Sequence, residues 1–160
     1  MGSKSTANAT PKGATASRTC DTSDMLLLHR MFRREFADMQ GHIVAAGANT
    51  KRSAIVGAYA LELVGLLHVH HHGEDEWLYP LLTSRVELDR ELFDKMDRQH
   101  VAVSDALDAI QADLTSWTAS ADLELGKKIA SDIAAIALAL GEHLDEEERS
   151  VLPIAARTLS

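Results

Sequence analysis

Two short segments of the chain carry the same arrangement of metal-binding side chains. Residues 70–80 read His-His-His-Gly-Glu-Asp-Glu-Trp-Leu-Tyr-Pro, and residues 143–153 read His-Leu-Asp-Glu-Glu-Glu-Arg-Ser-Val-Leu-Pro. Each segment contains His-x-x-x-Glu, and in each a proline follows six residues after the glutamate. Positions i and i+4 of a helix lie one turn apart on the same face. His70 with Glu74, and His143 with Glu147, can therefore each aim an imidazole and a carboxylate at one point.

A further histidine precedes each segment at a similar distance. His29 lies 41 residues before His70, and His100 lies 43 residues before His143. The chain thus consists of two copies of one unit, which together supply four imidazoles and two carboxylates. Two bridging carboxylates suit a pair of metal ions, and nitrogen and oxygen ligands without thiolate favour iron or manganese. Because Cys20 is the only cysteine, zinc-finger and iron–sulfur sites are excluded.

The other histidines lack a counterpart in the second segment. The positions that match His68, His71 and His72 are Gly141, Leu144 and Asp145. We interpret these three histidines and His42 as surface residues or as hydrogen-bond partners of the ligands. Among them His71 is the one expected to come nearest to the site, because it adjoins His70.

Acidic and aromatic residues surround the proposed ligands. Asp75, Glu76, Glu146 and Glu148 are expected to form a solvated face, from which any of them could hydrogen-bond to a ligating imidazole. The spacing of Tyr59 and of Tyr79 places neither residue near the metals. The remaining aromatic residues that we considered are expected in the core: Phe32, Phe36, Phe93 and Trp77.

Four amphipathic helices must position these residues. The apolar periodicity predicts helices over about 23–47, 50–79, 89–117 and 121–152. Pro80 and Pro153 are expected to end the second and fourth helices. The inward stripe of the second helix is predicted to comprise Leu63, Leu66, His70, Glu74, Trp77 and Leu81. The predicted fold is therefore all-α, an up-down-up-down four-helix bundle over residues 21–160, preceded by a disordered tail over residues 1–20.

Composition limits the classes of function. The 160 residues carry a net charge of −8, which disfavours binding to nucleic acid and to anionic membranes. With 46% hydrophobic residues the chain can fill a core. We found no apolar run near the 18 or so residues of a membrane span and no signal peptide, so a cytoplasmic location is expected. The oligomeric state stays open.

The pattern H…HxxxE…H…HxxxE on four helices resembles the hemerythrin-like, or HHE cation-binding, domain. The resemblance covers about residues 24–153, and the segment HHHGEDEWLYPLL closely resembles the second helix of actinobacterial members. It implies a non-haem di-iron centre with an oxo or hydroxo bridge, which handles O₂, NO or peroxide. By this resemblance the iron ligands are His29, His70, Glu74, His100, His143 and Glu147.

The sequence departs from the invertebrate oxygen carriers of this family. Their third helix carries two ligand histidines spaced His-x-x-x-His, whereas His100 has Met96 and Ser104 at those offsets. Their fourth helix uses a terminal histidine followed by aspartate. Two octahedral ions offer about 12 positions, and this ligand set leaves about two of them open, one more than in a five-histidine carrier.

Open positions favour catalysis over reversible oxygen carriage. The leading hypothesis is an enzyme that acts on small oxidants, by peroxide decomposition or by peroxide-dependent NO oxidation. The alternative is a non-catalytic protein that binds or senses O₂ or NO, and a third possibility is iron handling without turnover.

Overall fold

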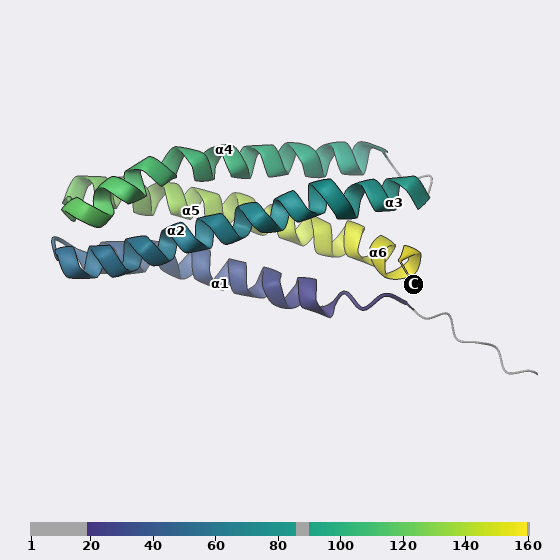
Figure 1. Ribbon diagram of the computed structural model, residues 1–160, viewed down its shortest axis with the longest axis horizontal. Coiled ribbons are helices and arrows are strands. Elements are labelled where there is room, and N and C mark those ends of the chain that lie inside the picture. Colours follow the sequence, from purple (N-terminus) through teal and green to yellow (C-terminus); the bar gives the residue numbers. More distant parts are fainter. Residues whose placement is uncertain (1–18, 86–89, 160) are drawn as a thin grey trace, which may run out of the picture.

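Four long helices lie side by side in the computed structural model, which describes residues 19–85 and 90–159 (Figure 1). Contacts join α1 to α5 and α2, and α4 to α2 and α5, so the helices enclose one common core. The predicted all-α four-helix bundle is confirmed. Most of the predicted tail, residues 1–18, lies outside the described residues. The long helices are α1 (Ser23–Ala46), α2 (Thr50–Gly73), α4 (Arg90–Ser120) and α5 (Leu123–Glu146).

Polar side chains and one glycine set the helix ends away from the proposed metal site. Gly47 ends α1 with a φ of 56°, a backbone angle that glycine adopts without strain. The Asn49 side chain then accepts hydrogen bonds from two backbone N–H groups at the start of α2. Asp122 caps α5 in the same way through the N–H of Leu125, at 2.7 Å. These short connections keep neighbouring helices antiparallel and fix their faces.

A five-residue π-helical turn follows α2 and another follows α5. These turns, η1 (Glu74–Leu78) and η2 (Glu147–Val151), lead into α3 (Tyr79–Arg85) and α6 (Leu152–Thr158). The N–H of Tyr79 donates to the carbonyl of Glu74, and the N–H of Leu152 donates to that of Glu147, five residues back in each case. Each turn thus begins at a glutamate of the repeat.

The prediction that the prolines end their helices is wrong. Pro80 and Pro153 are each the second residue of the α-helix that follows a π turn. A first-turn position tolerates proline because its N–H would have no partner within that helix. Figure 1 shows α3 continuing α2, and α6 continuing α5, at the same end of the molecule.

The π turn also changes which residues of this segment face inward. It adds one residue to the turn, so the helix beyond it is rotated relative to a regular α-helix. Tyr79 and Leu82 are buried, whereas Trp77 is 72% exposed and Leu81 is 39% exposed. The predicted inward positions of Trp77 and Leu81 are therefore wrong. Leu66, which precedes the turn, is also exposed, because Val64 and Leu67 fill the inner face there.

The buried apolar residues form two clusters along the bundle. The larger cluster fills most of the length and includes Phe32, Phe36, Leu67, Leu107 and Trp117. The smaller cluster lies between α3, α4, η2 and α6 and includes Tyr79, Leu82, Phe93, Met96, Val151 and Ala155. The predicted core positions of Phe32, Phe36 and Phe93 are thus confirmed. The histidines and glutamates of the repeat lie between the two clusters.

One helical segment of the described chain, Thr50–Arg85, is long and apolar enough to cross a membrane by length and composition. This finding differs from the expectation drawn from the sequence, which sought an uninterrupted apolar run. The core helix of a soluble protein passes the same test. Here the segment carries His70, His71 and Glu74 into the interior of the bundle, where all three are buried.

Candidate metal centre

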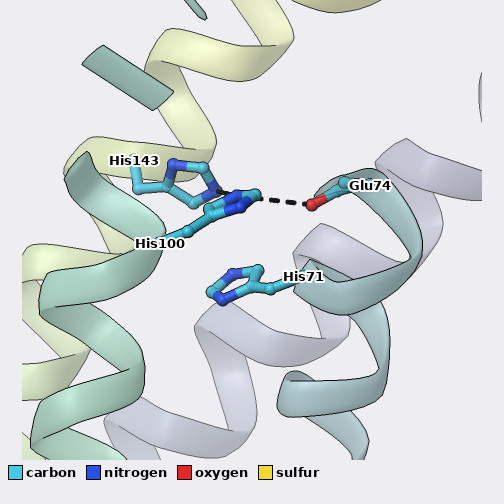
Figure 2. A group of neighbouring side chains, drawn as sticks. All are labelled: His71, Glu74, His100 and His143. Atoms are coloured by element: carbon cyan, nitrogen blue, oxygen red, sulfur yellow. Dashed lines mark hydrogen bonds and ion pairs between the residues drawn. The ribbon is translucent and has the colours of Figure 1, made fainter. Parts of the chain in front are cut away.

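The structure brings all six sequence-predicted ligands together, with one further histidine. Two groups of buried side chains each place their donor atoms within 4.8 Å of one another. Glu74 belongs to both groups, as a carboxylate shared by two metal ions would. Figure 2 shows the first group, to which α2, α4 and α5 contribute imidazoles. The groups are His71, Glu74, His100 and His143, and His29, His70, Glu74 and Glu147.

The two glutamates contact imidazoles from different helices. His70 Nε2 lies 3.4 Å from Glu74 Oε1, and His100 Nε2 lies 3.5 Å from Glu74 Oε2. Glu147 Oε2 lies 3.4 Å from His29 Nε2 and 4.0 Å from His143 Nε2. Each carboxylate therefore reaches both its own i−4 histidine and a histidine of the other copy of the repeat.

Several donor atoms at this centre are buried without a hydrogen-bond partner. They are His29 Nε2, His70 Nε2, both ring nitrogens of His71, both carboxylate oxygens of Glu74 and Glu147 Oε2. A buried polar atom without a partner costs roughly 1–3 kcal/mol, so a cluster of them needs a ligand that satisfies several at once. A metal pair would do so, and the nitrogen and oxygen donors fit such ions.

Hydrogen bonds hold three of the imidazoles by the nitrogen that faces away from the cluster. His29 Nδ1 lies 3.0 Å from Glu148 Oε1, and His100 Nδ1 lies 2.7 Å from Asp75 Oδ1. His143 Nδ1 lies 3.4 Å from the Gln99 side-chain oxygen. A carboxylate that accepts from Nδ1–H leaves the Nε2 lone pair directed at the cluster, as in many metal sites.

The four acidic residues next to the glutamates divide into two kinds. Asp75 and Glu148 bond to the imidazoles, and Arg33 holds Glu148 at 2.6 Å. Glu76 and Glu146 instead have surface partners: Glu76 contacts Trp77 and His72, and Glu146 pairs with Lys95. The sequence allowed any of the four to accept a hydrogen bond from a ligand imidazole. In the structure only Asp75 and Glu148 do so, and each directly follows a glutamate of the repeat.

His71 is a buried member of the cluster, which corrects its interpretation as a surface residue or a hydrogen-bond partner of the ligands. As expected, it is the one of the four histidines outside the repeat that comes nearest to the site. It is 2% exposed, and its ring stacks on that of His100 with centroids 4.2 Å apart. Figure 2 shows it on the same side of the cluster as Glu74. The imidazole that seemed to be missing beside His100 is therefore supplied by α2. His42 and His72 are exposed, as predicted, and half-buried His68 contacts Asp108 at 3.3 Å.

Tyr79 also lies at the cluster, contrary to the expectation from its spacing. Its hydroxyl donates to Glu147 Oε1 at 3.3 Å and lies 3.5 Å from His100 Nε2. Because the π turn rotates α3, a residue five positions after Glu74 points inward. Tyr59, in contrast, bonds to Glu35 on the surface and takes no part in the cluster.

Burial keeps the cluster close to electrically neutral. Burial and neighbouring histidines lower the pKa of His70 and of His143 to about 3, and burial also lowers the pKa of His71. Burial, with repulsion from Glu147, raises the pKa of Glu74 to about 10. The imidazoles are thus deprotonated at neutral pH, and the carboxyl pair keeps a proton that a bound cation would displace.

The chain matches a family model, and it does so over almost all of the described residues. The model is that of the hemerythrin HHE cation-binding domain, and the match covers residues 21–155. Comparisons with curated proteins and with solved structures give no match. The family's name describes a cation-binding domain, and the matched range contains every residue of the two donor groups. The chain therefore belongs to the hemerythrin HHE cation-binding domain family.

Proposed function

We propose that the two donor groups hold two iron ions that share Glu74. An imidazole-rich set without thiolate favours iron, whereas manganese prefers carboxylate and water ligands. The pair would supply two electrons, one from each ion. Hydrogen bonds that the Nδ1–H groups of His100 and His29 donate to Asp75 and Glu148 fix these two imidazoles before any metal binds. The proposed ligands are His29, His70, His71, Glu74, His100, His143 and Glu147.

We infer that the protein acts on small oxidants, with peroxide decomposition as its leading reaction and peroxide-dependent NO oxidation as the related one. The observation that supports this most is the buried hydroxyl of Tyr79 beside Glu147 and His100. Cleavage of an O–O bond needs a proton on the departing oxygen. Burial and the nearby carboxylates raise the pKa of Tyr79, so Oη stays protonated and donates a hydrogen bond into the cluster.

The surroundings of the cluster limit access by water. The Phe32 ring lies 5.3 Å from the His70 ring, and Met96 and Leu144 are fully buried next to ligand positions. Electrostatic interactions are stronger in a site that excludes water than they are in bulk water. The arrangement suits a reaction in which the protein delivers one proton from a fixed position.

A non-catalytic O₂ or NO binder is the second candidate, and His71 favours it. If Glu147 bridged the ions as Glu74 would, five imidazoles, two carboxylates and an oxo or hydroxo bridge would leave about one of about 12 positions open on two octahedral ions. Without His71 the same count leaves about two positions open. Ligand number therefore no longer favours catalysis by itself, and the enzyme hypothesis depends on the buried hydroxyl of Tyr79.

Stopped-flow absorption of the anaerobic, iron-loaded protein distinguishes the two candidates. We expect rapid oxidation by H₂O₂ and irreversible oxidation by air. Tyr79→Phe should keep its iron but slow the peroxide reaction by about 10²-fold. Tyr59→Phe, which removes a surface hydroxyl, is the control and should react as the native protein does. If the protein binds O₂ and releases it under vacuum, and does not turn over peroxide, it is the non-catalytic binder instead.

A further inference from the structure

A largely apolar cavity of about 430 Å³ opens beside the proposed metal centre. Its walls come from the start of α1, from α2 and η1, and from α6. The segment before α1 lies over α6, because the Cys20 N–H donates to the Ala156 carbonyl at 2.9 Å. The apolar residues of the lining are Met25, Val69, Leu78, Leu152, Ala155 and Leu159.

The cavity reaches two of the proposed ligands. His70 and Glu74 are part of its lining, and their side chains are only 5% and 4% exposed. Neither His70 Nε2 nor the Glu74 oxygens have a hydrogen-bond partner. A largely apolar pocket, which Asp21 and Thr22 also line, therefore adjoins donor atoms of the proposed metal site. Both His70 and Glu74 belong to the donor group that holds two imidazoles and two carboxylates.

The volume of the cavity far exceeds what O₂, NO or H₂O₂ requires. About 10–15 Å³ of such space holds a water molecule, and an apolar cavity of about 150 Å³ binds benzene. Apolar walls also offer H₂O₂ few hydrogen bonds to replace those it makes with water. The cavity fits a molecule with an apolar body and one polar head.

Two other hollows in the described part of the chain lack this combination. A groove of about 500 Å³ between α4 and α5 is lined by small side chains such as Ala106 and Ala139, and none of its lining residues has an unpartnered buried polar atom. An opening of about 340 Å³ beside Tyr79 is lined by Asp75, Asp94 and Asp97. Its carboxylates disfavour an apolar guest.

We propose that the apolar cavity binds organic hydroperoxides, ROOH with an apolar R group, and directs the peroxide group toward the metal position that His70 and Glu74 would hold. The inference rests on the proposed function and names a substrate class for it. Reduction of ROOH to the alcohol ROH and water would take two electrons, one from each ferrous ion held at the site, and two protons from solvent.

The test compares two exposed valines that each adjoin a proposed ligand. Val69 precedes His70 and lines the cavity, whereas Val101 follows His100 and does not line it. We expect the ferrous protein to be oxidised by cumene hydroperoxide. In Val69→Phe the rate with cumene hydroperoxide relative to H₂O₂ should fall at least about tenfold. Val101→Phe should leave this ratio unchanged.

A binding measurement on the metal-free protein gives a readout that is independent of turnover. The unreactive product, 2-phenyl-2-propanol, should cause saturable NMR shifts of the Leu78 and Ala155 methyl groups, and Val69→Phe should abolish them. No saturable binding, or an unchanged rate ratio in Val69→Phe, overturns the inference. If H₂O₂ oxidises the ferrous protein and cumene hydroperoxide does not, the inference is wrong but the proposed function stands. If both peroxides are inert, the proposed function fails as well.

Discussion

The two copies of the repeat build the same backbone but supply different side chains. His70 and His143, Glu74 and Glu147, and Pro80 and Pro153 are pairs separated by 73 residues. Both π turns begin at the glutamate of their copy. The residue after each glutamate bonds to Nδ1 of a histidine from the other copy. The framework of the centre is thus symmetric, and each copy orients a ligand of its partner.

The symmetry ends at two equivalent positions. Where the first copy has His71 and Tyr79, the second has Leu144 and Leu152. As a result one donor group holds three imidazoles and the other holds two. Tyr79 also lines the acidic opening, whereas Leu152 lines the apolar cavity. A duplicated scaffold therefore yields two donor groups of four residues each that differ in ligand type and in surroundings.

The shared carboxylate gives the largest expected effect. Because Glu74 belongs to both groups, Glu74→Ala should remove most of the iron from both positions. Elemental analysis after iron loading measures this. Glu76→Ala, which removes a carboxylate two residues away on the surface, should retain about as much iron as the native protein. Unchanged iron content in Glu74→Ala is incompatible with the assigned site.

Replacing His71 by the residue of the other copy tests the asymmetry itself. His71→Leu should reduce the three-imidazole group to two, so iron affinity, measured by competition with a chelator, should fall by at least about tenfold. The exposed neighbour His72 provides the control, and His72→Leu should bind iron as the native protein does. Native affinity in His71→Leu would restrict His71 to a structural role.

The hydrogen bonds to Nδ1 should matter equally in the two copies. Asp75→Asn and Glu148→Gln each replace a carboxylate with an amide beside a ligand imidazole, and each should weaken iron binding by about tenfold. The same chelator competition measures both variants. A loss confined to one of the two would show that the copies differ in this part of the framework too.

The metal-free protein should lose stability as the pH falls. The pKa of His70 and of His143 is about 3 in the folded protein and about 6.5 in the unfolded chain. Below pH 6.5 the unfolded chain therefore binds more protons at these two histidines, which favours unfolding by up to ~1.4 kcal/mol per pH unit for each. The raised pKa of Glu74 opposes this above about pH 4.5, because the folded protein keeps a carboxyl proton that the unfolded chain loses. The lowered pKa of the other three buried imidazoles acts in the same direction as that of His70 and His143. Urea unfolding between pH 6.5 and 4 measures the slope, and iron-loaded protein is the comparison. A stability that rises over this range would contradict the buried neutral imidazoles.

Much of the centre was predictable because the repeat is visible in the sequence. The duplicated His-x-x-x-Glu and the preceding histidines identified six residues of the two donor groups. His71 and Tyr79 were missed because the prediction relied on positions that occur in both copies, and neither residue has a counterpart in the second copy. A search for unpaired histidines adjoining a ligand would have retained His71, which directly follows His70.

The rest depended on a backbone feature that regular periodicity does not contain. A period of 3.6 residues assigns Trp77 and Leu81 to the core, but the π turn rotates them outward and brings Tyr79 inward. The one available signal was the proline six residues after each glutamate. We interpreted it as a helix end, whereas it marks the first turn of a new helix.

Mössbauer spectroscopy of the anaerobic protein loaded with ⁵⁷Fe(II) tests the proposed centre most directly. Two iron positions with three and two imidazoles have different electronic surroundings, so the account predicts two irons per chain and two ferrous doublets of equal area. His71→Leu should bring the two doublets closer together or remove one. A single iron per chain, or two irons with one shared doublet, would contradict an asymmetric dinuclear centre.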